Sequence, residues 1–538
     1  MLSLMQILLL LLVVIAAVAV LARRLQVPPA ILLVITGVIL ALVPGLPPVK
    51  LAPEFVLLIV LPPVIYSSAV AMSWREFRFN LRPITQLAIG CVVFTTAAVA
   101  AATHWFLGLA WPVGFVVGAI VSPPDAVAPL SIARRMQLPR SILVILEGEG
   151  LANDATALIL YRFAVVAVSA GVFSFSHAVA TFSAVLAGEL LWGLGVGWLM
   201  LHLRRWVREP RIEILLSVLT PYVAYWPPEH LGGSGVVATV VTGLYISWNG
   251  LRLIGAETRL QGIFFWDFLI YVTEGMIFLL TGLQAHALMS SLKEGIDGFS
   301  IFQLGIAASV VCAVVILTRA IWMYPATYLP RWLSPSLARR DPAPPWQWPF
   351  ILSFTGVRGI VSLAAALAIP FVTDDGVEFP DRDLILFLTF AVILVTLVGQ
   401  GLLLPTIIRA LGLAERGRIE RHDVRAEEFA ARRQAIEAAI EQLDELTTAR
   451  GLPEEIVAPI RLHQQGRLNH VWQRGEDGEA QQRVVKTHDE IERLLISVER
   501  DSVNEMYRAG RLKDEARRRI ERDLDLREAR LTNLLANE

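Results

Sequence analysis

The chain has 538 residues, of which 55% are hydrophobic and only 18% are charged, and its mean hydropathy is +0.58. These values are typical of a polytopic membrane protein and exclude a chain built only from water-soluble domains. Cys91 and Cys312 lie in separate apolar segments, which excludes a disulfide framework and a cysteine-rich zinc site.

Thirteen apolar segments are candidates for membrane-spanning helices. They lie at about residues 2–21, 28–46, 52–72, 84–107, 112–133, 141–170, 178–203, 212–227, 233–250, 262–290, 300–328, 348–372 and 383–410. The first has no basic residue ahead of its apolar run and is followed by Arg23 and Arg24, which is typical of a first span and not of a cleaved signal peptide. The sequence therefore predicts an all-α polytopic membrane protein with about thirteen transmembrane helices.

The basic residues are divided unequally between alternate loops. One set of loops holds only Lys50, Lys293 and Arg382. The other set holds Arg23, Arg24, Arg75, Arg78, Arg82, Arg134, Arg135, Arg140, Arg204, Arg205, Arg208, Arg211, Arg252, Arg259, Arg331, Arg339 and Arg340. The positive-inside rule places the arginine-rich loops in the cytoplasm, so we expect the N-terminus outside and the C-terminal tail inside.

The fifth apolar segment contains Ser122, Pro123, Pro124 and Asp125 near its middle. Each proline removes a backbone donor and crowds the carbonyl four residues earlier, so an interrupted helix is expected. Transporters build ion sites near the bilayer midplane from such half-helices. Asp125 is expected beside the exposed amides of the second half-helix. The alternative is a simple proline kink in a packed helix.

Three polar side chains lie close together in the sixth segment, at Glu149, Asn153 and Asp154. Inserting a charged group at mid-bilayer costs a free energy of roughly 2.5 to 3.5 kcal/mol, so we first interpret an acid there as a functional residue. Glu149 and Asn153 share a helix face, and Asp154 lies at its edge. A polar contact between helices is the alternative for a single buried acid, but three polar groups so close together favour an ion site.

The twelfth segment is interrupted by Thr355, Gly356, Arg358 and Gly359. It follows the fifth by seven spans and has the opposite orientation, which predicts inverted repeats and two crossed, interrupted helices around a binding site. In that arrangement we expect Asp125 to offset exposed amides in one interrupted span and Arg358 to offset exposed carbonyls in the other. We also expect Arg358 to pair with an acid of the sixth segment, because an unpaired guanidinium there would be costly.

The composition changes after about residue 411 to Glu, Arg, Ala and Gln, with apolar residues at helical spacing. We therefore predict a transmembrane domain at residues 1–411 and a cytoplasmic helical tail at residues 412–538. The glycines of the tail are isolated, so no phosphate-binding loop is expected. The tail is expected to be a solvated hairpin or a dimer contact, and a regulatory role is the alternative.

With these motifs the chain resembles the bacterial sodium/proton antiporters of the monovalent cation:proton antiporter family 1. The resemblance covers about residues 1–411 and is specific when its motifs are taken together. The motifs are Leu61 to Pro63, Ser122 to Ala128, Glu147 to Asp154, Thr220 to Tyr222, Ser234 to Val236 and Gly356 to Leu363.

The resemblance implies a role for each polar residue of the candidate site. Asp154 is expected to take the cation and the proton in turn, and Asp125 to lie near the ion in the unwound span. Asn153 marks the electroneutral branch of the family, and Glu149 is expected to pair with Arg358. A homodimer in the bacterial inner membrane is also implied.

The chain departs from the family pattern at two positions. Relatives often carry serine where this chain has Gly150, and threonine or serine where it has Pro124. Each departure removes a hydroxyl that could bind Na⁺, so carbonyls or water would have to replace it.

We therefore predict a secondary antiporter that exchanges Na⁺, and also Li⁺, for H⁺ by alternating access at Asp154. One free carboxylate predicts one H⁺ per Na⁺. Neither a nucleophile with a base nor a metal-binding histidine spacing is found, so no enzyme, resident metal or cofactor is predicted, and no nucleic-acid partner. A K⁺/H⁺ antiporter of the same fold is the alternative, and a cation channel, which would need rings of polar residues around a pore, is less favoured.

Overall fold

The computed structural model of the chain describes residues 4–43, 51–170, 175–207, 209–294, 299–373, 376–475 and 479–536. Lys50 and Arg208, which enter the loop asymmetry above, lie outside these residues. The described residues are helical apart from loops and one antiparallel bridge, between Val372 and Glu378. They divide into two compact units, Met1–Arg418 and Ile419–Glu538. The predicted all-α fold is confirmed for this part of the chain.

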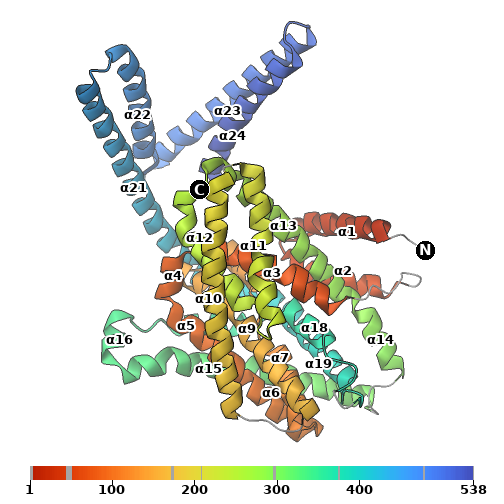
Figure 1. Cartoon of the computed structure of the whole chain (residues 1–538). Coiled ribbons are helices and arrows are strands. Elements are labelled where there is room, and N and C mark those ends of the chain that lie inside the picture. Colours follow the sequence, from red (N-terminus) through yellow and green to blue (C-terminus); the bar gives the residue numbers. More distant parts are fainter. Residues whose placement is uncertain are drawn as a thin grey trace. The chain divides into compact units, whose positions relative to one another are not determined.

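The first half of the larger unit is a series of helices of very different length (Figure 1). Its elements are α1 Leu4–Leu25, α2 Pro29–Ala41, η1 Phe55–Val60, α3 Leu61–Ala71, α4 Trp74–Phe79, α5 Leu81–Thr85, η2 Gln86–Cys91, α6 Val92–Leu107, α7 Trp111–Val121, α8 Val127–Arg135 and α9 Arg140–Ala170. The elements η1 and η2 are π-helical turns that continue directly into α3 and α6.

The second half of the larger unit contains several of its longest helices. Its elements are α10 Phe175–Val207, α11 Pro210–His230, α12 Val236–Leu253, α13 Ala256–Leu283, α14 Ala285–Glu294, α15 Ile301–Leu333, α16 Pro335–Arg340, α17 Gln347–Phe354, α18 Ile360–Leu367, α19 Arg382–Leu394, η3 Val395–Gln400 and α20 Gly401–Ala410.

Seven helices among the described residues are long and apolar enough to cross a membrane by themselves. They are Met5–Leu25, Leu81–Leu107, Arg140–Ser169, Ala180–Val207, Ala256–Met289, Ile301–Leu333 and Arg382–Ala410. Shorter apolar helices lie at Pro29–Ala41, Phe55–Ala71, Trp111–Val121 and Val236–Gly250. Length and composition thus mark a multi-pass membrane protein, while the thirteen crossings and the inverted repeat stay predictions.

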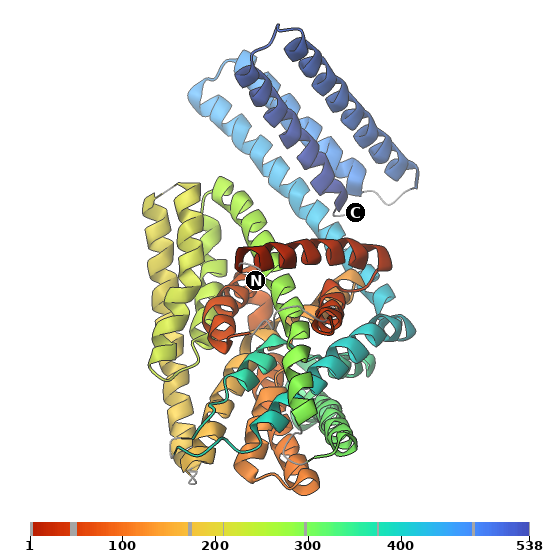
Figure 2. The ribbon, with the colours of Figure 1, turned by 90° about the vertical axis from the view of Figure 1, so that its right-hand side faces the viewer.

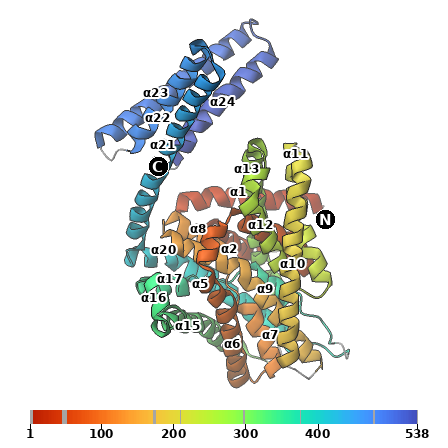
Figure 3. The same ribbon diagram turned by 60° about the vertical axis from the view of Figure 1, so that its left-hand side comes forward.

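Glycines allow neighbouring helices of this unit to pack closely against each other. A Cβ added at Gly118 of α7 would lie 2.4 Å from the carbonyl oxygen of Thr96 in α6. Similarly, a Cβ at Gly37 of α2 would lie 2.4 Å from the carbonyl oxygen of Leu279 in α13. Small residues of this kind let membrane helices approach closely. Gly118 thus lets α7 pack closely against α6, and α7 also packs along α9 (Figure 3).

The smaller unit contains most of α21 Leu413–Arg450 together with α22 Glu454–Gly475, α23 Glu479–Arg508 and α24 Asp514–Ala536. Helices α23 and α24 run alongside each other (Figure 2) and bury Ile496, Leu524 and Leu531 between them. Arg500 also bridges from α23 to two acids of α24, at 2.7 and 2.9 Å. Exposed pairs of this kind contribute about 0.2 to 1 kcal/mol each, so the apolar contact is the main source of this packing.

Candidate functional site

The first interruption lies between α7 and α8, at residues 122–126, where the sequence predicts it. The carboxylate of Asp125 accepts a hydrogen bond from the amide of Val127 at 2.9 Å. That amide belongs to the first turn of α8, where the helix itself offers no carbonyl to accept its hydrogen bond. Asp125 therefore lies at the exposed amides of the second half-helix, as the sequence predicts.

The second interruption lies between α17 and α18, at residues 355–359. Its start is held by the hydroxyl of Thr355, which donates to the carbonyl of Leu352 at 3.0 Å. Near its end the amide of Arg358 donates to the hydroxyl of Thr396, on η3, at 2.9 Å. Part of the non-helical backbone is thus hydrogen-bonded to a neighbouring helix, as such backbone requires inside a membrane.

The two interruptions are in direct contact with each other. The amide of Asp125 donates to the carbonyl oxygen of Val357 at 2.7 Å. A Cβ added at Gly359 would fall 1.8 Å from Oδ2 of Asp125, so only glycine leaves room for this carboxylate. The interrupted segments therefore meet with the acid of one placed against the backbone of the other.

Arg358 binds backbone carbonyls at this crossing. Its Nε donates to Val121 at 2.9 Å and its Nη2 to Ser122 at 3.3 Å, while Nη1 donates to Gly356. Val121 and Ser122 end α7, so their carbonyls have lost the helical amides that would otherwise bond them. The guanidinium is also favoured there by the negative end of the helix dipole. Arg358 therefore offsets exposed carbonyls as predicted, but mainly those of the other interrupted span.

The predicted ion pair between Glu149 and Arg358 is wrong. Glu149 is bound by Arg319 of α15 through two parallel contacts, at 2.5 and 2.8 Å. Both side chains are almost completely buried, at 3% and 1% exposure. A bidentate guanidinium satisfies both carboxylate oxygens, and the guanidinium of Arg358 is already occupied by the α7 carbonyls. Arg319 also donates to the carbonyl of Leu352 at 3.0 Å, which ties the pair to α17.

A cavity of about 430 Å³ opens at the crossing. Its wall includes Asp125 and Pro124 from the first interruption, Asp154 and Gly150 from α9, and residues of α3, α13 and α18. Further acids in the wall are Glu147, Asp267 and Glu274. The structure thus brings Asp125 and Asp154 to one cavity, whereas Glu149 and Arg358 are outside its lining.

Asn153 of α9 is fully buried and is not among the residues that line the cavity. Its Nδ2 donates to the carbonyl oxygen of Pro124 at 2.5 Å, which leaves Oδ1 as the remaining acceptor. Within the described residues, Asn153 Oδ1 and Asp125 Oδ2 are buried oxygens without a hydrogen-bond partner. Buried polar atoms are nearly always partnered, so two such oxygens at one crossing are suited to bind a cation or a proton.

A family model described as sodium/hydrogen exchanger, transmembrane, matches residues 8–410. The chain belongs to the sodium/hydrogen exchanger family. The match covers the larger unit, which contains both interruptions and the cavity, and leaves out the tail. The resemblance of the motifs to sodium/proton antiporters of the monovalent cation:proton antiporter family 1 is therefore confirmed.

Named relatives agree with this family. An uncharacterized Na⁺/H⁺ exchanger of Mycobacterium bovis is 34% identical over 515 residues, 94% of this chain and 92% of that protein. A Na⁺/H⁺ antiporter of Aphanothece halophytica is 29% identical over 492 residues, 90% of this chain and 89% of that protein. A sodium, potassium, lithium and rubidium/H⁺ antiporter of Bacillus pumilus is 31% identical over 379 residues, 69% of this chain and 56% of that protein.

A solved structure shares the fold. The sodium proton antiporter of Methanocaldococcus jannaschii, solved at pH 8, superposes with a TM-score of 0.58 and covers 76% of this chain and 98% of that one. Its sequence identity of 20% supports the fold alone.

Several residues of the site are absent from the predicted set. Arg319 was visible as a lone charge in an apolar segment, but so was Arg358, and sequence spacing does not decide between them. Thr396 gave no signal, and Ser362 lies in the motif Gly356 to Leu363 but was not singled out, because a helical hydroxyl usually bonds a carbonyl of its own helix. Glu274 reaches the cavity from α13 together with Asp267, two turns away on the same face.

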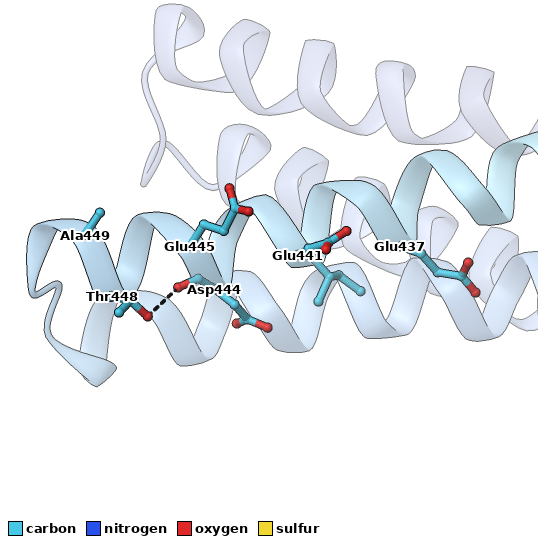
Figure 4. Close-up of a pocket in the computed structure, with 7 residues that line it drawn as sticks. Glu437, Glu441, Asp444, Glu445, Thr448 and Ala449 are labelled. Carbon is cyan, nitrogen blue, oxygen red and sulfur yellow. Dashed lines mark hydrogen bonds between the residues drawn. The ribbon is translucent and has the colours of Figure 1, made fainter.

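The tail holds a separate shallow hollow, of about 750 Å³, along α21. Its lining is acidic and comes from Glu437, Ile440, Glu441, Asp444, Glu445, Thr448 and Ala449 (Figure 4). Asp444 is held by Arg461 of α22 at 2.7 Å. The remaining acids follow the exposed face of a helix, which is the ordinary arrangement of a solvated surface.

Proposed function

We propose that this member of the sodium/hydrogen exchanger family exchanges Na⁺, and also Li⁺, for H⁺ by alternating access, with Asp154 shared by the two ions. The observation that carries the proposal is the cavity that contains Asp154 and Asp125 at the crossing of two interrupted helices. Intramembrane acids in contact with unwound backbone are how many secondary transporters bind their coupling ions.

The cation would be held by oxygen atoms of three residues. Asp154 supplies a carboxylate from α9, and Asp125 supplies Oδ2, which has no partner among the described residues. Asn153 supplies Oδ1, since its amide nitrogen is used by the carbonyl of Pro124. Carboxylate and amide oxygens replace the hydration shell of an alkali cation. A proton on Asp154 removes the same negative charge, so Na⁺ and H⁺ compete for the site.

The charges at the crossing favour a ratio of one Na⁺ to one H⁺. Glu149 is paired with Arg319 and Glu147 with Arg134, and Asn153 has no charge, so we take Asp154 as the one carboxylate that binds Na⁺ or H⁺. A single Na⁺ or a single H⁺ neutralises this carboxylate. Because moving an uncompensated charge through a low-dielectric region is costly, the protein reorients only when the site is loaded. Exchange then requires neither ATP nor a cofactor and is electroneutral.

K⁺/H⁺ exchange at the same site is the second candidate. It is favoured by the similarity to the antiporter of Bacillus pumilus, which is named for sodium, potassium, lithium and rubidium. Both candidates use Asp154 in the same way and differ only in the ion.

The remaining proposals concern placement in the membrane. We place the N-terminus outside and the tail in the cytoplasm of a bacterial cell, because of the arginine asymmetry of the loops. Homodimerisation is proposed from the family resemblance. Impermeant labelling of cysteines introduced at Arg75 and at Arg382 tests the orientation, since only the second is expected to react from outside.

The exchange is tested with purified protein in liposomes that carry an imposed pH gradient, to which Na⁺, Li⁺ and K⁺ are added in turn. We expect Na⁺ and Li⁺ to dissipate the gradient at rates that do not change when the membrane potential is set with valinomycin. Asp154→Asn should abolish this exchange while the protein stays folded. Asp383→Asn, an exposed acid at the start of α19 outside the cavity, is the matched control and should exchange normally.

Two results would contradict the proposal. Exchange in Asp154→Asn close to that of the wild type would show that the acid is misassigned. A rate that follows the imposed potential would exclude the one-to-one ratio. Exchange with K⁺ alone would favour the second candidate.

A further inference from the structure

Ser362 is a buried hydroxyl in the wall of the ion cavity. It is the third residue of α18, directly after the second interruption. Its side chain is 2% exposed, and it lines the same cavity as Asp125 and Asp154. Its Oγ is buried and has no hydrogen-bond partner within the described part of the chain.

The interruption explains why this hydroxyl has no partner. Many other buried hydroxyls in the bundle donate to a carbonyl one turn earlier in their own helix, as Thr96 does to Val92 at 2.8 Å and Thr281 to Ile277 at 2.9 Å. The equivalent carbonyls for Ser362 belong to Arg358 and Gly359, which are not helical. An unpartnered buried hydroxyl is costly, and one in a cavity wall, as Ser362 is, can be satisfied by a ligand in that cavity.

The position of Ser362 relative to Asp125 is set by Gly359. A Cβ at Gly359 would fall 1.8 Å from Oδ2 of Asp125, so this oxygen lies against the start of α18. Ser362 follows Gly359 by three residues and thus lies about one turn further along the same face. The free oxygen of Asp125 and the free hydroxyl of Ser362 therefore come from two different interrupted helices but lie at one end of α18.

The cavity also lacks hydroxyls where relatives often have them. A Cβ at Gly150 would lie 2.5 Å from the Cβ of Ala126, so a serine does not fit there without a shift. Pro124 has no hydroxyl, and its carbonyl already accepts from Asn153. Ser131, another lining residue, donates to Ala128 at 2.8 Å.

We infer that the Ser362 hydroxyl is an oxygen ligand of the transported alkali cation, contributed by the second interrupted helix. It takes the place of the hydroxyls missing at Gly150 and Pro124. The inference rests on the proposed function and adds a residue that determines ion affinity. A hydroxyl oxygen accepts the cation through a lone pair and keeps its own proton, so this ligand adds no charge and leaves the one-to-one ratio unchanged.

The test is equilibrium binding of ²²Na⁺ to the purified full-length protein, which does not depend on transport. In Ser362→Ala we expect the Kd for Na⁺ to rise about tenfold, as for the loss of one hydrogen-bond-type contact to a charged group. Ser362→Thr keeps the hydroxyl and should bind nearly as the wild type does. Ser362→Cys keeps the size but offers a poor Na⁺ ligand, so it should resemble the alanine variant.

Thr389→Val is the matched control. Thr389 of α19 is also completely buried, with a hydroxyl that lacks a partner among the described residues, but it is outside the cavity. Its replacement should leave the Kd for Na⁺ unchanged. An equal rise of the Kd for Na⁺ in Thr389→Val and Ser362→Ala would overturn the inference, because it would indicate a general effect of losing a buried hydroxyl.

The remaining outcomes distinguish the role of Ser362 from the proposed exchange function. Wild-type affinity in both Ser362→Ala and Ser362→Cys would overturn the role of Ser362 and leave the exchange function intact. Wild-type affinity in Asp154→Asn would overturn the proposed function itself. If the wild type binds ⁸⁶Rb⁺ and not ²²Na⁺, the same variants are compared with ⁸⁶Rb⁺, and an unchanged Kd in Ser362→Ala again overturns the inference.

Discussion

Two buried charged clusters lie close together in the larger unit, and they differ in how completely their atoms are satisfied. In the first, Arg319 binds both carboxylate oxygens of Glu149 at 2.5 and 2.8 Å. In the second, at the crossing of the interrupted helices, Asp125, Asn153 and Ser362 each keep one buried oxygen without a partner among the described residues.

The comparison separates a structural role from a binding role. In a buried bidentate ion pair both carboxylate oxygens are already bound, and removing one partner leaves the other charge buried without compensation. Oxygens without a partner cost free energy until a ligand arrives, so they are expected where an ion binds. The first cluster should therefore govern stability, and the second should govern affinity and exchange.

The largest effect is expected at the first cluster. Arg319→Ala leaves Glu149 buried without its partner, which should lower the free energy of unfolding by about 3 to 5 kcal/mol. The measurement is thermal unfolding of the purified protein. Replacing both partners, as in Glu149→Leu with Arg319→Met, removes the unpaired charge and should recover most of this loss. Equal melting temperatures for the single and the double variant would contradict a structural pair.

Arg358→Ala is the comparison that separates the two buried arginines. It leaves Glu149 paired and removes the donors to the carbonyls of Val121, Ser122 and Gly356, so we expect a smaller loss of stability than in Arg319→Ala. A larger loss in Arg358→Ala would mean that the carbonyl contacts outweigh the ion pair.

The second prediction disturbs the contact between the two interrupted segments without removing a charge. In Gly359→Ala the added methyl group would fall 1.8 Å from Oδ2 of Asp125, so the carboxylate must move. A displacement of about 1 Å at a binding site can cost roughly a hundredfold in rate, and we expect a loss of that order in Na⁺/H⁺ exchange with the protein still folded. The measurement is exchange in liposomes together with the melting temperature.

Gly305→Ala in α15 is the control for this substitution. A Cβ there meets no atom within 4 Å, so exchange should be unchanged and the helix slightly stabilised. Normal exchange in Gly359→Ala would show that the position of Asp125 against α18 is not needed.

The sequence predicted the two interruptions because proline and glycine act locally on the backbone. It also predicted two of the acids that line the cavity, since Asp125 follows the prolines and Asp154 lies in an apolar helix, but it did not predict Glu147, Asp267 and Glu274 there. The partner of Glu149 could not be predicted, because Arg319 and Arg358 are both single charges in apolar segments and the choice depends on how α15 and α18 pack. Ser362 lies within the motif Gly356 to Leu363, but its free hydroxyl could not be predicted, since it depends on α18 starting only two residues earlier.

The smallest effect is expected at Gly150, where the family often has serine. In Gly150→Ser the new Cβ would lie 2.5 Å from the Cβ of Ala126, and such overpacking costs about 1 to 3 kcal/mol. Adding Ala126→Gly removes the methyl group in the way, so the melting temperature of the double variant should approach that of the wild type.

The double variant also places a hydroxyl in the cavity wall, on the α9 side. If hydroxyls at Gly150 and Ser362 serve the same cation, Gly150→Ser with Ala126→Gly should restore part of the Na⁺ affinity lost in Ser362→Ala. The Kd for ²²Na⁺ in the triple variant measures this, with Ser362→Ala plus Ala126→Gly as the control that lacks the new hydroxyl. Equal affinity in the triple variant and its control would show that the two positions do not face the same ion, and that a hydroxyl from α18 is not interchangeable with one from α9.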